Sequence, residues 1–454
     1  MEKTDKNTQT MEELVSFAKR RGFVYQASDI YGGVAGMYDF GPYGTELKNN
    51  LKRLWWQSVV YKRADVVGLD SAIIQHPKVW EASGHTERFS DPMVDCKACK
   101  HRFRADKLVD IDSTDQDELI EGLKTTKCPH CGKLDWTEPR SFNLLVETSL
   151  GSIEGEKQIS YLRGETCQGI YTNFATVVDT TRAKIPFGIA QIGKAFRNEI
   201  TPSDWLFRQR EFEQMEMQMF VHPDDASKVF EAWKAERMAW QQQLFGTDAV
   251  RFREHGPNER AHYAKAAYDI EYLYPFGFKE MEGIHNRGDW DLSRHSKYSG
   301  KDLSYFDEAR SERFIPWVIE TSVGVDRLFM AVMHHAYDEE EVNGEKRVVL
   351  RFNKEIAPVK VAVLPLSKKP ELSEVAQQVF STIAGDYSVE YDETQSIGRR
   401  YRRQDEIGTP YCVTVDFETL DDKSVTVRER DSMKQERIKI EELQAYLADQ
   451  LKTF

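Results

Sequence analysis

A set of charged and aromatic side chains lies within residues 190–221 and suits the chemistry of a nucleotide. Its members are Arg197, Glu199, Arg208, Arg210 and Phe212. Arginine forks bind phosphate through paired hydrogen bonds, an aromatic face stacks on a base, and a carboxylate accepts hydrogen bonds from amino groups. These residue types predict a site for a nucleotide together with an amine-bearing partner. The alternative is a surface sheet with salt-bridged charges, but the concentration of charges favours the binding site.

Two pairs of cysteines have the spacing of metal-binding knuckles. Cys96 and Cys99 form the first pair, and Cys128 and Cys131 form the second after a short spacer. Because each pair can present two thiolates to one ion, the pattern predicts a structural zinc site like that of a zinc ribbon. We expect the zinc to hold a small insert together and to take no part in chemistry. Loss of the metal is the alternative, although all four ligands are present. The spare ligand candidates are His101 and His130.

More carboxylates occur near the ends of predicted strands. Glu165 and Gln168 lie in a glycine-flanked turn that follows an apolar strand. Glu280 and Glu282 stand two positions apart, so one strand face can present both to a divalent ion. A solvated pair of carboxylates is the alternative, and the spacing alone favours it.

Arg327 follows a predicted strand that carries Glu320 and Ser322 on one face. It lies in the first turn of a predicted helix, where free backbone N–H groups and the helix dipole favour an anion. A surface arginine is the alternative, but the preceding Glu/Ser strand and glycine favour phosphate contact.

The elements that must position these groups can be read from hydrophobic periodicity. Residues 190–221 alternate on both sides of a Thr-Pro-Ser-Asp cluster, which predicts a hairpin of two strands. The alternation places Arg197 and Glu199 on one face of the first strand. On the second strand, one face is apolar and the other carries Phe212, Gln214, Glu216 and Gln218. The apolar face consists of Met215, Met217, Met219 and Val221.

The flanking sequence predicts further helices and a strand. Apolar residues at helical spacing predict helices at residues 11–23, 42–61, 224–246 and 325–337. Residues 315–321 alternate as a strand. The glycine-rich segments 31–36 and 40–44 lack the phosphate-loop pattern, so we expect turns and packing there. Adjacent tryptophans, Trp55 and Trp56, cannot both face one core stripe, which points to coverage of one of them by a partner subunit.

The bulk composition limits the classes of function. A chain of 454 residues is long enough for about two or three domains. Its net charge of -13 provides no global basic field, so a polyanion would have to be held by local patches. The polar N-terminus shows no secretory signal, no run is long and apolar enough for a membrane span, and paired cysteines suit a reducing compartment. We therefore expect a cytoplasmic protein without a membrane partner.

The composition changes at the acidic run 338–345, which is predicted to be a solvated linker. The remaining residues read strand, helix, strand, helix, strand, strand, helix, which is a small α/β domain. Its basic run 399–403 suits phosphate and base contact, and a solvated helix face is an equally favoured alternative.

Together these motifs resemble those of the class II aminoacyl-tRNA synthetases, and specifically the dimeric glycyl type, over essentially the whole chain. The family's second motif resembles Phe196-Arg-Asn-Glu199 with Arg208 and Arg210-Glu-Phe212, and its third resembles Gly324-Val-Asp-Arg327. Its dimer-forming first motif region resembles Gly41-Pro-Tyr-Gly44 and the helix that ends in Trp55-Trp56. The glycine-specific signatures resemble residues 163–169, 211–216 and 319–322.

The resemblance implies an α/β (α+β) fold with an antiparallel-sheet catalytic domain, a zinc-ribbon-like insert and a C-terminal mixed α/β anticodon-binding domain. The catalytic domain would comprise residues 1–95 and 135–340, interrupted by the insert at residues 96–134. A linker at residues 341–357 would lead to the anticodon-binding domain at residues 358–454.

The resemblance also implies what each site residue does. Arg197 would contact the α-phosphate of ATP, Arg208 and Arg327 would hold its γ-phosphate, and Arg197 and Arg327 would be the catalytic residues. Glu199 would accept from the adenine amino group, Phe212 would stack on the base, and Glu280 would help to bind Mg²⁺. The ammonium group of glycine would be held by three carboxylates with a hydroxyl beside them. These residues are Glu165, Glu216, Glu320 and Ser322.

The implied activity is ATP-dependent ligation of glycine to tRNA(Gly) through a glycyl-adenylate, with release of AMP and pyrophosphate, by a homodimer. Glycine has no side chain, so recognition must come from charge and tight walls that reject an added methyl group. Departures from the family pattern occur at Gly164, Cys167, Phe278 and His285. The alternatives are a threonyl or prolyl enzyme of the same architecture, and a synthetase-like nucleic-acid-binding protein without catalysis.

Overall fold

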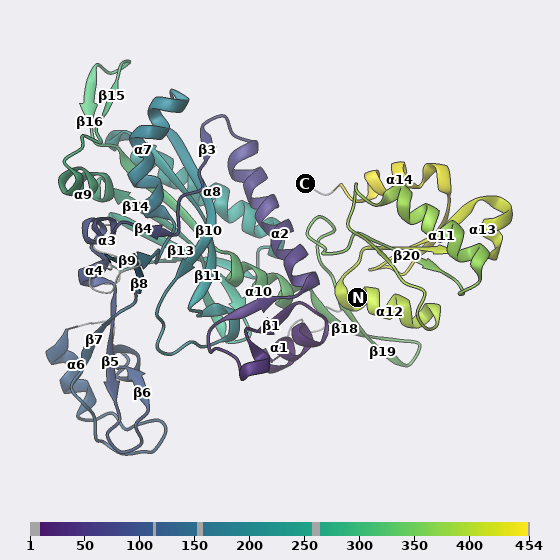
Figure 1. Ribbon diagram of the computed structural model, residues 1–454, viewed down its shortest axis with the longest axis horizontal. Helices are drawn as coiled ribbons and strands as arrows, with labels where there is room; N and C mark the ends of the chain where they lie inside the picture. Colours follow the sequence, from purple (N-terminus) through teal and green to yellow (C-terminus); the bar gives the residue numbers. More distant parts are fainter. Residues whose placement is uncertain (1–9, 112–114, 152–157, 257–263, 453–454) are drawn as a thin grey trace.

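The computed structural model describes residues 10–111, 115–151, 158–256 and 264–452. Figure 1 shows a larger N-terminal part and a separate C-terminal domain on the right. The larger part is built on an antiparallel sheet and the C-terminal domain on a mixed sheet, which confirms the predicted α/β (α+β) class.

The central sheet brings together strands that are distant in the sequence. Its strand order is β12 (Val250–Glu254), β13 (Ala266–Tyr274), β14 (Gly277–Gly288), β17 (Trp317–Gly324), β11 (Glu211–Val221), β10 (Phe187–Phe196) and β3 (Val66–Gly68). Neighbours run antiparallel except β3, which is parallel to β10. On β11, Glu216 stands opposite Ser322 of β17, and Gln218 stands opposite Glu320. The register therefore places polar residues of β11 and β17 side by side.

The hairpin of β10 and β11 has the predicted apolar back. Met215, Met217 and Met219 are buried in the main core. Helices α2 (Pro42–Trp56), α8 (Ala226–Phe245) and α10 (Val325–Ala336) contribute to the same core. The opposite face of the hairpin packs on α7 (Cys167–Thr181) and α9 (Trp290–Ser299) through a second core that includes Phe220. Strand alternation thus divides β11 between a core face and a functional face.

The predicted placement of Arg197 and Glu199 on the first strand was wrong. Strand β10 ends at Phe196, and both residues lie in the connection that follows it. The backbone N–H of Glu199 bonds to the carbonyl of Arg197 at 2.7 Å, which closes a tight local turn. Because the chain turns here, strand alternation no longer determines where the two side chains point.

The N-terminal region packs around the large sheet. Helix α1 (Met11–Arg20) begins with a capping box between Thr10 and Glu13, and a five-residue π-helical segment (Gln57–Tyr61) continues α2. The other elements here are β1 (Val24–Gln26), η1 (Asp29–Tyr31), β2 (Tyr38–Phe40), β4 (Ile74–Gln75), α3 (Pro77–Ser83) and α4 (His85–Arg88).

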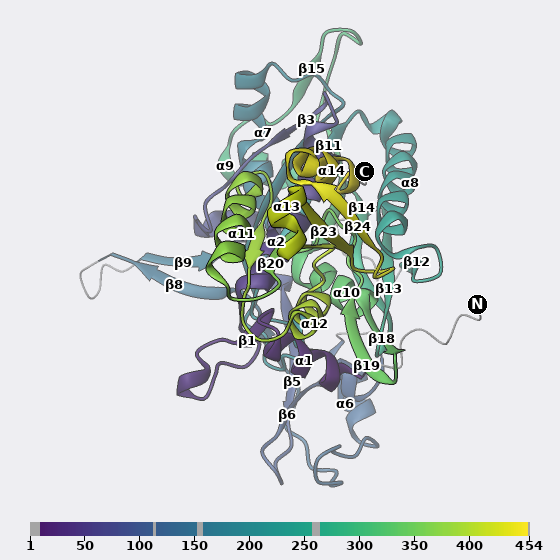
Figure 2. The same ribbon diagram turned by 90° about the vertical axis from the view of Figure 1, so that its right-hand side faces the viewer.

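The predicted insert forms a small body that extends from the catalytic part (Figure 1). It contains β5 (Ser90–Asp95), β6 (Arg102–Arg104), α5 (Ala105–Leu108), α6 (Gln116–Leu123) and β7 (Arg140–Asn143). Val94, Ala105, Leu119 and Leu123 form its buried core, to which Trp136 adds. Strands β8 (Val146–Leu150) and β9 (Gln158–Leu162) then leave the body as a ribbon that projects in Figure 2.

Shorter elements complete the N-terminal part. These are η3 (Trp205–Phe207), η4 (Pro223–Asp225), β15 (Tyr305–Asp307) and β16 (Glu312–Phe314). Within the described residues, every helix is too short or too polar to cross a membrane.

The acidic run at residues 338–345 is structured, which differs from the predicted solvated linker. It belongs to a hairpin of β18 (Tyr337–Val342) and β19 (Glu345–Leu350). Arg347 of β19 is fully buried and donates to Asp405 at 2.8 Å, so the hairpin is fastened to the C-terminal domain. Basic residues of this region pair with the acidic side chains of β18: Lys346 with Glu339, Arg347 with Glu340 and Arg351 with Asp338.

The C-terminal sheet has the order β21 (Val389–Tyr391), β20 (Val361–Pro365), β22 (Tyr411–Val415), β23 (Ser424–Glu429) and β24 (Gln435–Lys439). Its helices are α11 (Pro370–Ile383), α12 (Ile397–Ile407), α13 (Phe417–Asp422) and α14 (Leu443–Gln450), the last preceded by η5 (Ile440–Glu442). The predicted order of elements is confirmed, but α13 and β24 were missed. Helix α13 is very short, and β24 is too polar to show alternation.

Direct contacts join the C-terminal domain to the N-terminal part. Tyr43 donates to Glu390 at 2.5 Å, and Arg21 pairs with Glu406 at 2.7 Å. Asn50 of α2 donates to the carbonyl of Ala357 at 3.0 Å. Helix α2 therefore contacts the segment that leads into the C-terminal domain.

Candidate active site

The functional face of the hairpin borders a cavity of about 120 Å³. The connection after β10, strand β11, the end of β17 and the start of α10 supply its walls. The lining includes all six residues with predicted nucleotide roles, namely Arg197, Glu199, Arg208, Phe212, Glu280 and Arg327, together with Ser322. The structure therefore brings these groups together from segments that lie far apart in the sequence.

Arg197 lies between two aromatic rings at one wall of the cavity. Its guanidinium carbon is 5.1 Å from the ring centroid of Phe89 and 5.2 Å from that of Phe212. Its Nε donates to the carbonyl of Gly164 at 3.2 Å, which leaves the terminal nitrogens of the fork to face a ligand. Cation–π contact and one hydrogen bond thus fix its orientation before any ligand arrives.

Glu199 provides a buried acceptor at the same wall. Only 6% of the residue is exposed, and none of the described residues donates a hydrogen bond to its buried Oε2. Arg208 approaches this oxygen to 3.6 Å, which is too long for a hydrogen bond. Buried carboxylate oxygens are normally satisfied, so Oε2 suits a donor group on a ligand.

Arg327 closes the opposite side of the cavity, in the first turn of α10. Its Nη1 lies 3.1 Å from Oε2 of Glu280, and its guanidinium stacks on Phe207 at 4.2 Å from the ring centroid. Arg327 lowers the pKa of the half-exposed Glu280, because the cation favours the ionised carboxylate. This pair provides one cation and one carboxylate at the rim.

The predicted pairing of Glu280 with Glu282 on one face was wrong. Ile270 pairs with Glu282, whereas the next residue of β13, Glu271, pairs with Glu280. This register shift inserts one extra residue into β14, so Glu280 and Glu282 point to opposite faces of the sheet. Glu282 is fully buried and accepts from Arg237 at 2.5 Å, which makes it part of the core.

The three remaining carboxylates converge in a buried pocket behind the cavity. Glu216 is 2% exposed and Glu320 is 3% exposed. Glu216 accepts from Ser322 at 2.8 Å and from Thr166 at 2.5 Å. Glu320 accepts from Arg287 at 3.0 Å, and Glu165 joins them from the start of α7. The structure therefore places Glu165, Glu216, Glu320 and Ser322 in one cluster.

Arg163 positions the segment that carries Glu165. Its guanidinium is 2% exposed and donates to the carbonyls of Lys194 and Ser71 at 2.6 and 2.8 Å. A Cβ atom at Gly193 would lie 2.1 Å from the guanidinium, so only glycine allows this approach. Gln168, which we predicted to lie in the turn, is instead in the first turn of α7.

The three carboxylates differ in their ionisation. Burial alone would raise the pKa of Glu165, but His85 and Arg287 bring the pKa well below its usual range. Burial likewise opposes ionisation of Glu320, but Arg287 and His285 lower its pKa. Burial, followed by repulsion from Glu320 and Glu165, raises the pKa of Glu216 to about 8. In the absence of a ligand, no positive charge next to Glu216 favours its ionised form, and a bound cation would do so.

Sequence reasoning missed the groups that balance these charges. His85 of α4 lies 3.4 Å from Glu165, and Arg287 of β14 is almost completely buried between Asp291 and Glu320. Gln218, on the same face as Glu216, donates to Glu320 at 2.9 Å. Strand alternation had already placed Gln218 on this face, whereas His85 and Arg287 come from distant segments.

The departures from the family pattern fall around this pocket. His285 lies 2.8 Å from Glu320 through its Nδ1, and the Cys167 thiol donates to Glu165 at 3.0 Å. Burial raises the pKa of the Cys167 thiol well above its usual value, which makes it a packed thiol and not a nucleophile. A Cβ atom at Gly164 would lie 3.1 Å from the ring of Phe89, so the small residue accommodates that ring. Phe278 instead stacks with Arg251, 4.0 Å from its guanidinium carbon to the ring centroid, and is not among the residues that line the cavity.

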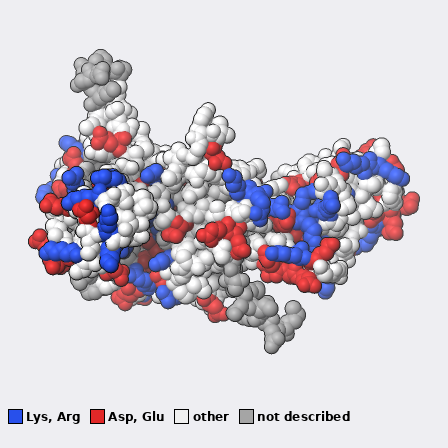
Figure 3. Space-filling model, turned by 90° about the horizontal axis from the view of Figure 1, so that it is seen from below, with Lys and Arg blue, Asp and Glu red and all other residues white. Residues whose placement is uncertain are grey.

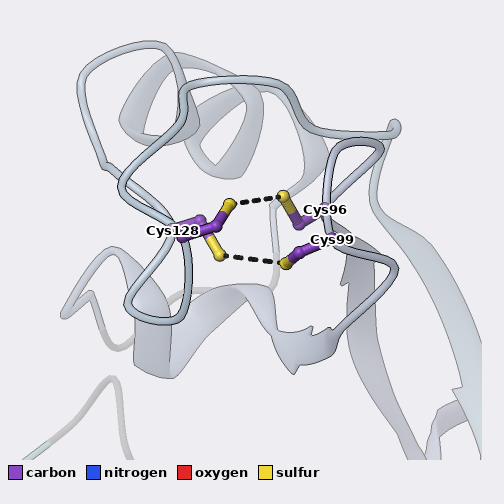
Figure 4. A group of neighbouring side chains, drawn as sticks. Cys96, Cys99 and Cys128 are labelled. Atoms are coloured by element: carbon purple, nitrogen blue, oxygen red, sulfur yellow. Dashed lines mark hydrogen bonds between the residues drawn. The ribbon is translucent and has the colours of Figure 1, made fainter.

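The four predicted zinc ligands lie together in the insert (Figure 4). The Sγ atoms of Cys96 and Cys131 are 3.6 Å apart, and those of Cys99 and Cys128 are 3.7 Å apart. Zn–S bonds of about 2.3 Å in a tetrahedron give sulfur separations of about 3.8 Å. The thiol set therefore fits one tetrahedral zinc ion.

The basic run of the C-terminal domain is mostly paired within the protein. Arg400 is 1% exposed and donates to the carbonyl of Pro365 at 2.6 Å, Arg403 pairs with Asp392, and Arg402 lies 3.4 Å from Asp405. Arg399 remains exposed. The run as a whole is therefore less available to a phosphate backbone than its sequence indicates.

Comparisons with known proteins agree with this architecture. The family model "tRNA synthetase class II core domain (G, H, P, S and T)" matches residues 150–336, and the model "Anticodon binding domain" matches residues 360–450. A glycine–tRNA ligase of Borreliella burgdorferi is 50% identical over 448 residues, covering 97% of each chain. A glycine–tRNA ligase of Clostridium acetobutylicum is 50% identical over 463 residues, covering 98% of this chain and 100% of the relative.

A solved structure shares the fold at low sequence identity. A prolyl-tRNA synthetase from Cryptosporidium parvum in complex with L-proline and AMP superposes with a TM-score of 0.62 at 17% identity. The match covers 99% of this chain and 76% of that chain.

Proposed function

Because this chain belongs to the glycine–tRNA ligase family of class II synthetases, we propose that it ligates glycine to tRNA(Gly) at the expense of ATP, through a glycyl-adenylate. The observation that carries the proposal is the cluster of Glu165 with the buried Glu216 and Glu320, directly behind the arginine-lined cavity. An ammonium group in the cluster and a triphosphate in the cavity would place the glycine carboxylate beside the α-phosphorus.

The side chains that line the cavity would each bind a different part of ATP. Arg197, held between two rings, would bind the α-phosphate, and Phe212 would stack on the adenine. The unsatisfied Oε2 of Glu199 would accept from the adenine amino group. Arg208 and Arg327 would hold the γ-phosphate, since both line the cavity and retain partly exposed guanidinium groups.

Adenylate formation requires little covalent help from the protein. The glycine carboxylate attacks the α-phosphorus in line, the bond to the bridging oxygen breaks, and pyrophosphate leaves. Arg197 would stabilise the charge that develops on the α-phosphoryl oxygens, and Arg327 would stabilise the charge on the leaving group. The terminal hydroxyl of the tRNA then attacks the adenylate carbonyl and releases AMP.

Glu280 would help to bind the Mg²⁺ that accompanies ATP. Its half-exposed carboxylate lies at the cavity rim and is kept ionised by Arg327, which suits an oxygen ligand for a hard cation. The ion would supply further charge neutralisation to the phosphates when bound.

The zinc ion would be structural. Cys96, Cys99, Cys128 and Cys131 fit a tetrathiolate site, and the insert has only a small apolar core to hold it folded. A thiolate site of this kind suits the reducing cytoplasm, where we place the enzyme. Metal analysis of the purified protein should find one tightly bound zinc per chain, and protein without zinc would contradict the assignment.

The C-terminal domain would bind the tRNA, as the matched anticodon-binding family indicates. In Figure 3, basic and acidic side chains are interspersed over the face that is seen, so no single charge sign dominates it. Together with the net charge of -13, this supports binding through local basic patches.

The enzyme would act as a homodimer through the region of α2. Tyr61, at the end of the π-helical continuation of α2, is 75% exposed beside a hollow lined by Leu54 and Trp240. The hollow also carries polar side chains such as Gln57, Glu236 and Gln243, so the exposed aromatic group is the feature that favours a protein interface here. Tyr61→Glu should shift the sedimentation coefficient from dimer to monomer, whereas Phe306→Glu on the β15–β16 hairpin should not. A monomeric wild-type protein would refute the assignment.

Glycine-dependent exchange of pyrophosphate into ATP tests the proposed activity. We expect exchange with glycine and none with alanine, threonine or proline. Exchange with one of the others instead would indicate a different amino-acid specificity, and the absence of exchange with any of them would favour an accessory protein.

A further inference from the structure

The base of the insert lies directly against the wall of the cavity that carries Arg197 and Glu199. The chain enters the insert through α4 and Phe89, and leaves it through the end of β7 and Leu144. Phe89 is one of the two rings that flank Arg197, with a centroid distance of 5.1 Å. The carbonyl of Leu144 accepts from the backbone N–H of Asn198 at 2.8 Å. Both sides of the base thus contact the connection that follows β10.

Asn143, the last residue of β7, joins these two sides. Its side-chain amide donates to the carbonyls of His85 and Thr86 in α4 at 3.0 and 3.1 Å, and its Oδ1 accepts from the N–H of Leu145 at 2.8 Å. Asn143 pairs with Ser90 at the end of the ladder between β5 and β7. Because the ladder ends here, the side chain of Asn143 continues the connection as far as α4.

One backbone hydrogen bond runs beside this side chain. The N–H of Leu144 donates to the carbonyl of Phe89 at 2.9 Å. Phe89 and Leu144 are therefore bonded to each other, while the first contacts Arg197 and the second bonds to Asn198. A shift of either side of the base would move the connection that contains Arg197.

The insert is also electrostatically close to Glu199. Burial raises the pKa of Asp91 on β5, Arg104 of β6 opposes the rise from 2.9 Å, and the negative charge of Glu199 adds to it. Arg104 also pairs with Asp106 at 2.7 Å. The charges of the insert and of the cavity wall therefore act on each other across the junction.

From these contacts we propose that Asn143 is a positioning residue for ATP recognition: by joining the two sides of the insert base, it holds Phe89 against Arg197 and fixes the connection that leads to Glu199. The proposal rests on the proposed roles of Arg197 and Glu199 in binding ATP. Asn143 is not among the residues that line the cavity, so it acts through its neighbours.

Arg197 and Glu199 need such support because they lie after the end of β10, where sheet hydrogen bonds no longer hold the backbone. The strength of a hydrogen bond falls steeply with distance and angle, so a small displacement of Glu199 would weaken its bond to the adenine amino group. A displacement of this kind acts on recognition of the nucleotide even when its cause lies outside the cavity.

Discrimination between two nucleotides tests the proposal in the full-length, zinc-containing chain. Purine riboside triphosphate lacks the amino group that Glu199 would recognise. In glycine-dependent pyrophosphate exchange, the wild type should prefer ATP over this analogue about tenfold or more in kcat/KM, the value of a charge-assisted hydrogen bond. Asn143→Ala should raise the KM for ATP and reduce this preference at least about threefold, because the bond becomes misaligned. A loss of folded protein would instead lower kcat for both nucleotides equally and leave the preference unchanged.

Asn173→Ala is the matched control. Asn173 of α7 is also half-buried and donates to a backbone carbonyl, that of Gly169, at 2.7 Å. Its replacement should leave the preference for ATP at the wild-type value. If Asn143→Ala does not fold, Asn143→Asp carries the same expectation, since it keeps the shape and the acceptor for Leu145 but loses the two donors. Zinc content and circular dichroism identify the variants that are folded.

The possible failures have different meanings. A wild type that uses both nucleotides equally would refute the proposed role of Glu199 at the adenine amino group, and this proposal with it. A wild type that prefers ATP, together with a folded Asn143 variant of the same preference, would overturn the positioning role alone. A rise in the KM for glycine that exceeds the rise for ATP would also overturn it, because Asn143 would then act through His85, which lies 3.4 Å from Glu165.

Discussion

Replacing Glu216 by glutamine isolates the charge in the proposed glycine pocket. The side chains have the same shape, and a glutamine can still bond to Ser322, Thr166 and Gln214, which surround Glu216 at 2.8, 2.5 and 3.0 Å. The substitution therefore removes a carboxylate without opening a cavity. We expect it to raise the KM for glycine and to leave the KM for ATP almost unchanged.

The size of the effect should depend on pH. Burial and the neighbouring Glu320 and Glu165 raise the pKa of Glu216 to about 8 in the empty pocket. An ammonium group favours the ionised carboxylate, so glycine binding must release the proton that Glu216 carries below this pKa. By linkage, the wild-type KM for glycine should fall about tenfold between about pH 6 and about pH 7, and level off above about pH 8.

The Glu216→Gln protein carries no such proton, so its KM for glycine should be nearly independent of pH in this range. Near pH 8, where the wild-type carboxylate is ionised, the lost charged hydrogen bond should cost about 1.5–3 kcal/mol, or about tenfold to a hundredfold in KM. The ratio of variant to wild-type KM should therefore grow as pH rises.

Pyrophosphate–ATP exchange measures both constants when glycine and ATP are varied in turn between about pH 6 and about pH 8. Glu341→Gln, an exposed carboxylate on the β18–β19 hairpin, is the control and should follow the wild type. A KM ratio that does not change with pH would refute the charge argument. Equal increases in the KM values for glycine and ATP would refute the assignment of Glu216 to the ammonium.

Three further substitutions test other parts of the site. Arg327→Ala should raise the KM for ATP about tenfold or more and affect glycine less, because it removes a charge-assisted phosphate contact; unchanged ATP kinetics in the exchange assay would contradict this. Cys131→Ser should lower the tightly bound zinc to near zero and make the insert sensitive to limited proteolysis. Zinc retained at one per chain would show that other groups hold the ion. His285→Ala should raise the KM for glycine severalfold, to at most about tenfold, because Glu320 loses a donor at 2.8 Å that keeps it ionised; a lower KM would mean that the imidazole competes with the ammonium.

Sequence periodicity predicted the hairpin because its second strand is regular. From Met215 to Val221 every second side chain is apolar and buried, so alternation alone assigned Glu216 to the functional face. The same rule failed at Glu280 and Glu282, because β14 contains one extra residue between them relative to β13. Nothing in the sequence pattern marks this extra residue. It also failed at Arg197, where the backbone turns immediately after β10. Periodicity is thus reliable only as long as the ladder of hydrogen bonds continues.

The partners of the carboxylates could not be predicted from the sequence, because they depend on which distant segments pack together. His85 comes from a four-residue helix before the insert, and Arg287 comes from β14, the neighbour of the strand that carries Glu320. Charged motifs reveal which groups act on a substrate. The groups that set their ionisation become visible only in the folded chain.

In the proposed glycine pocket, the charged groups and the packed walls have different tasks: the charges bind the ammonium group, and the walls exclude larger side chains. Glu165 and Glu320 have cationic or imidazole partners within the protein, whereas the described residues that donate to Glu216 are all neutral and its pKa is elevated. One incoming cation would therefore complete the charge balance, but every amino acid carries an ammonium group, so charge alone cannot select glycine. Selection must come from exclusion by the fully buried Thr166 and Cys167 and their neighbours, since tight packing rejects an added methyl group more readily than it detects a missing one. Electrostatics would thus provide affinity for an amino acid, and packing would restrict that affinity to the smallest one.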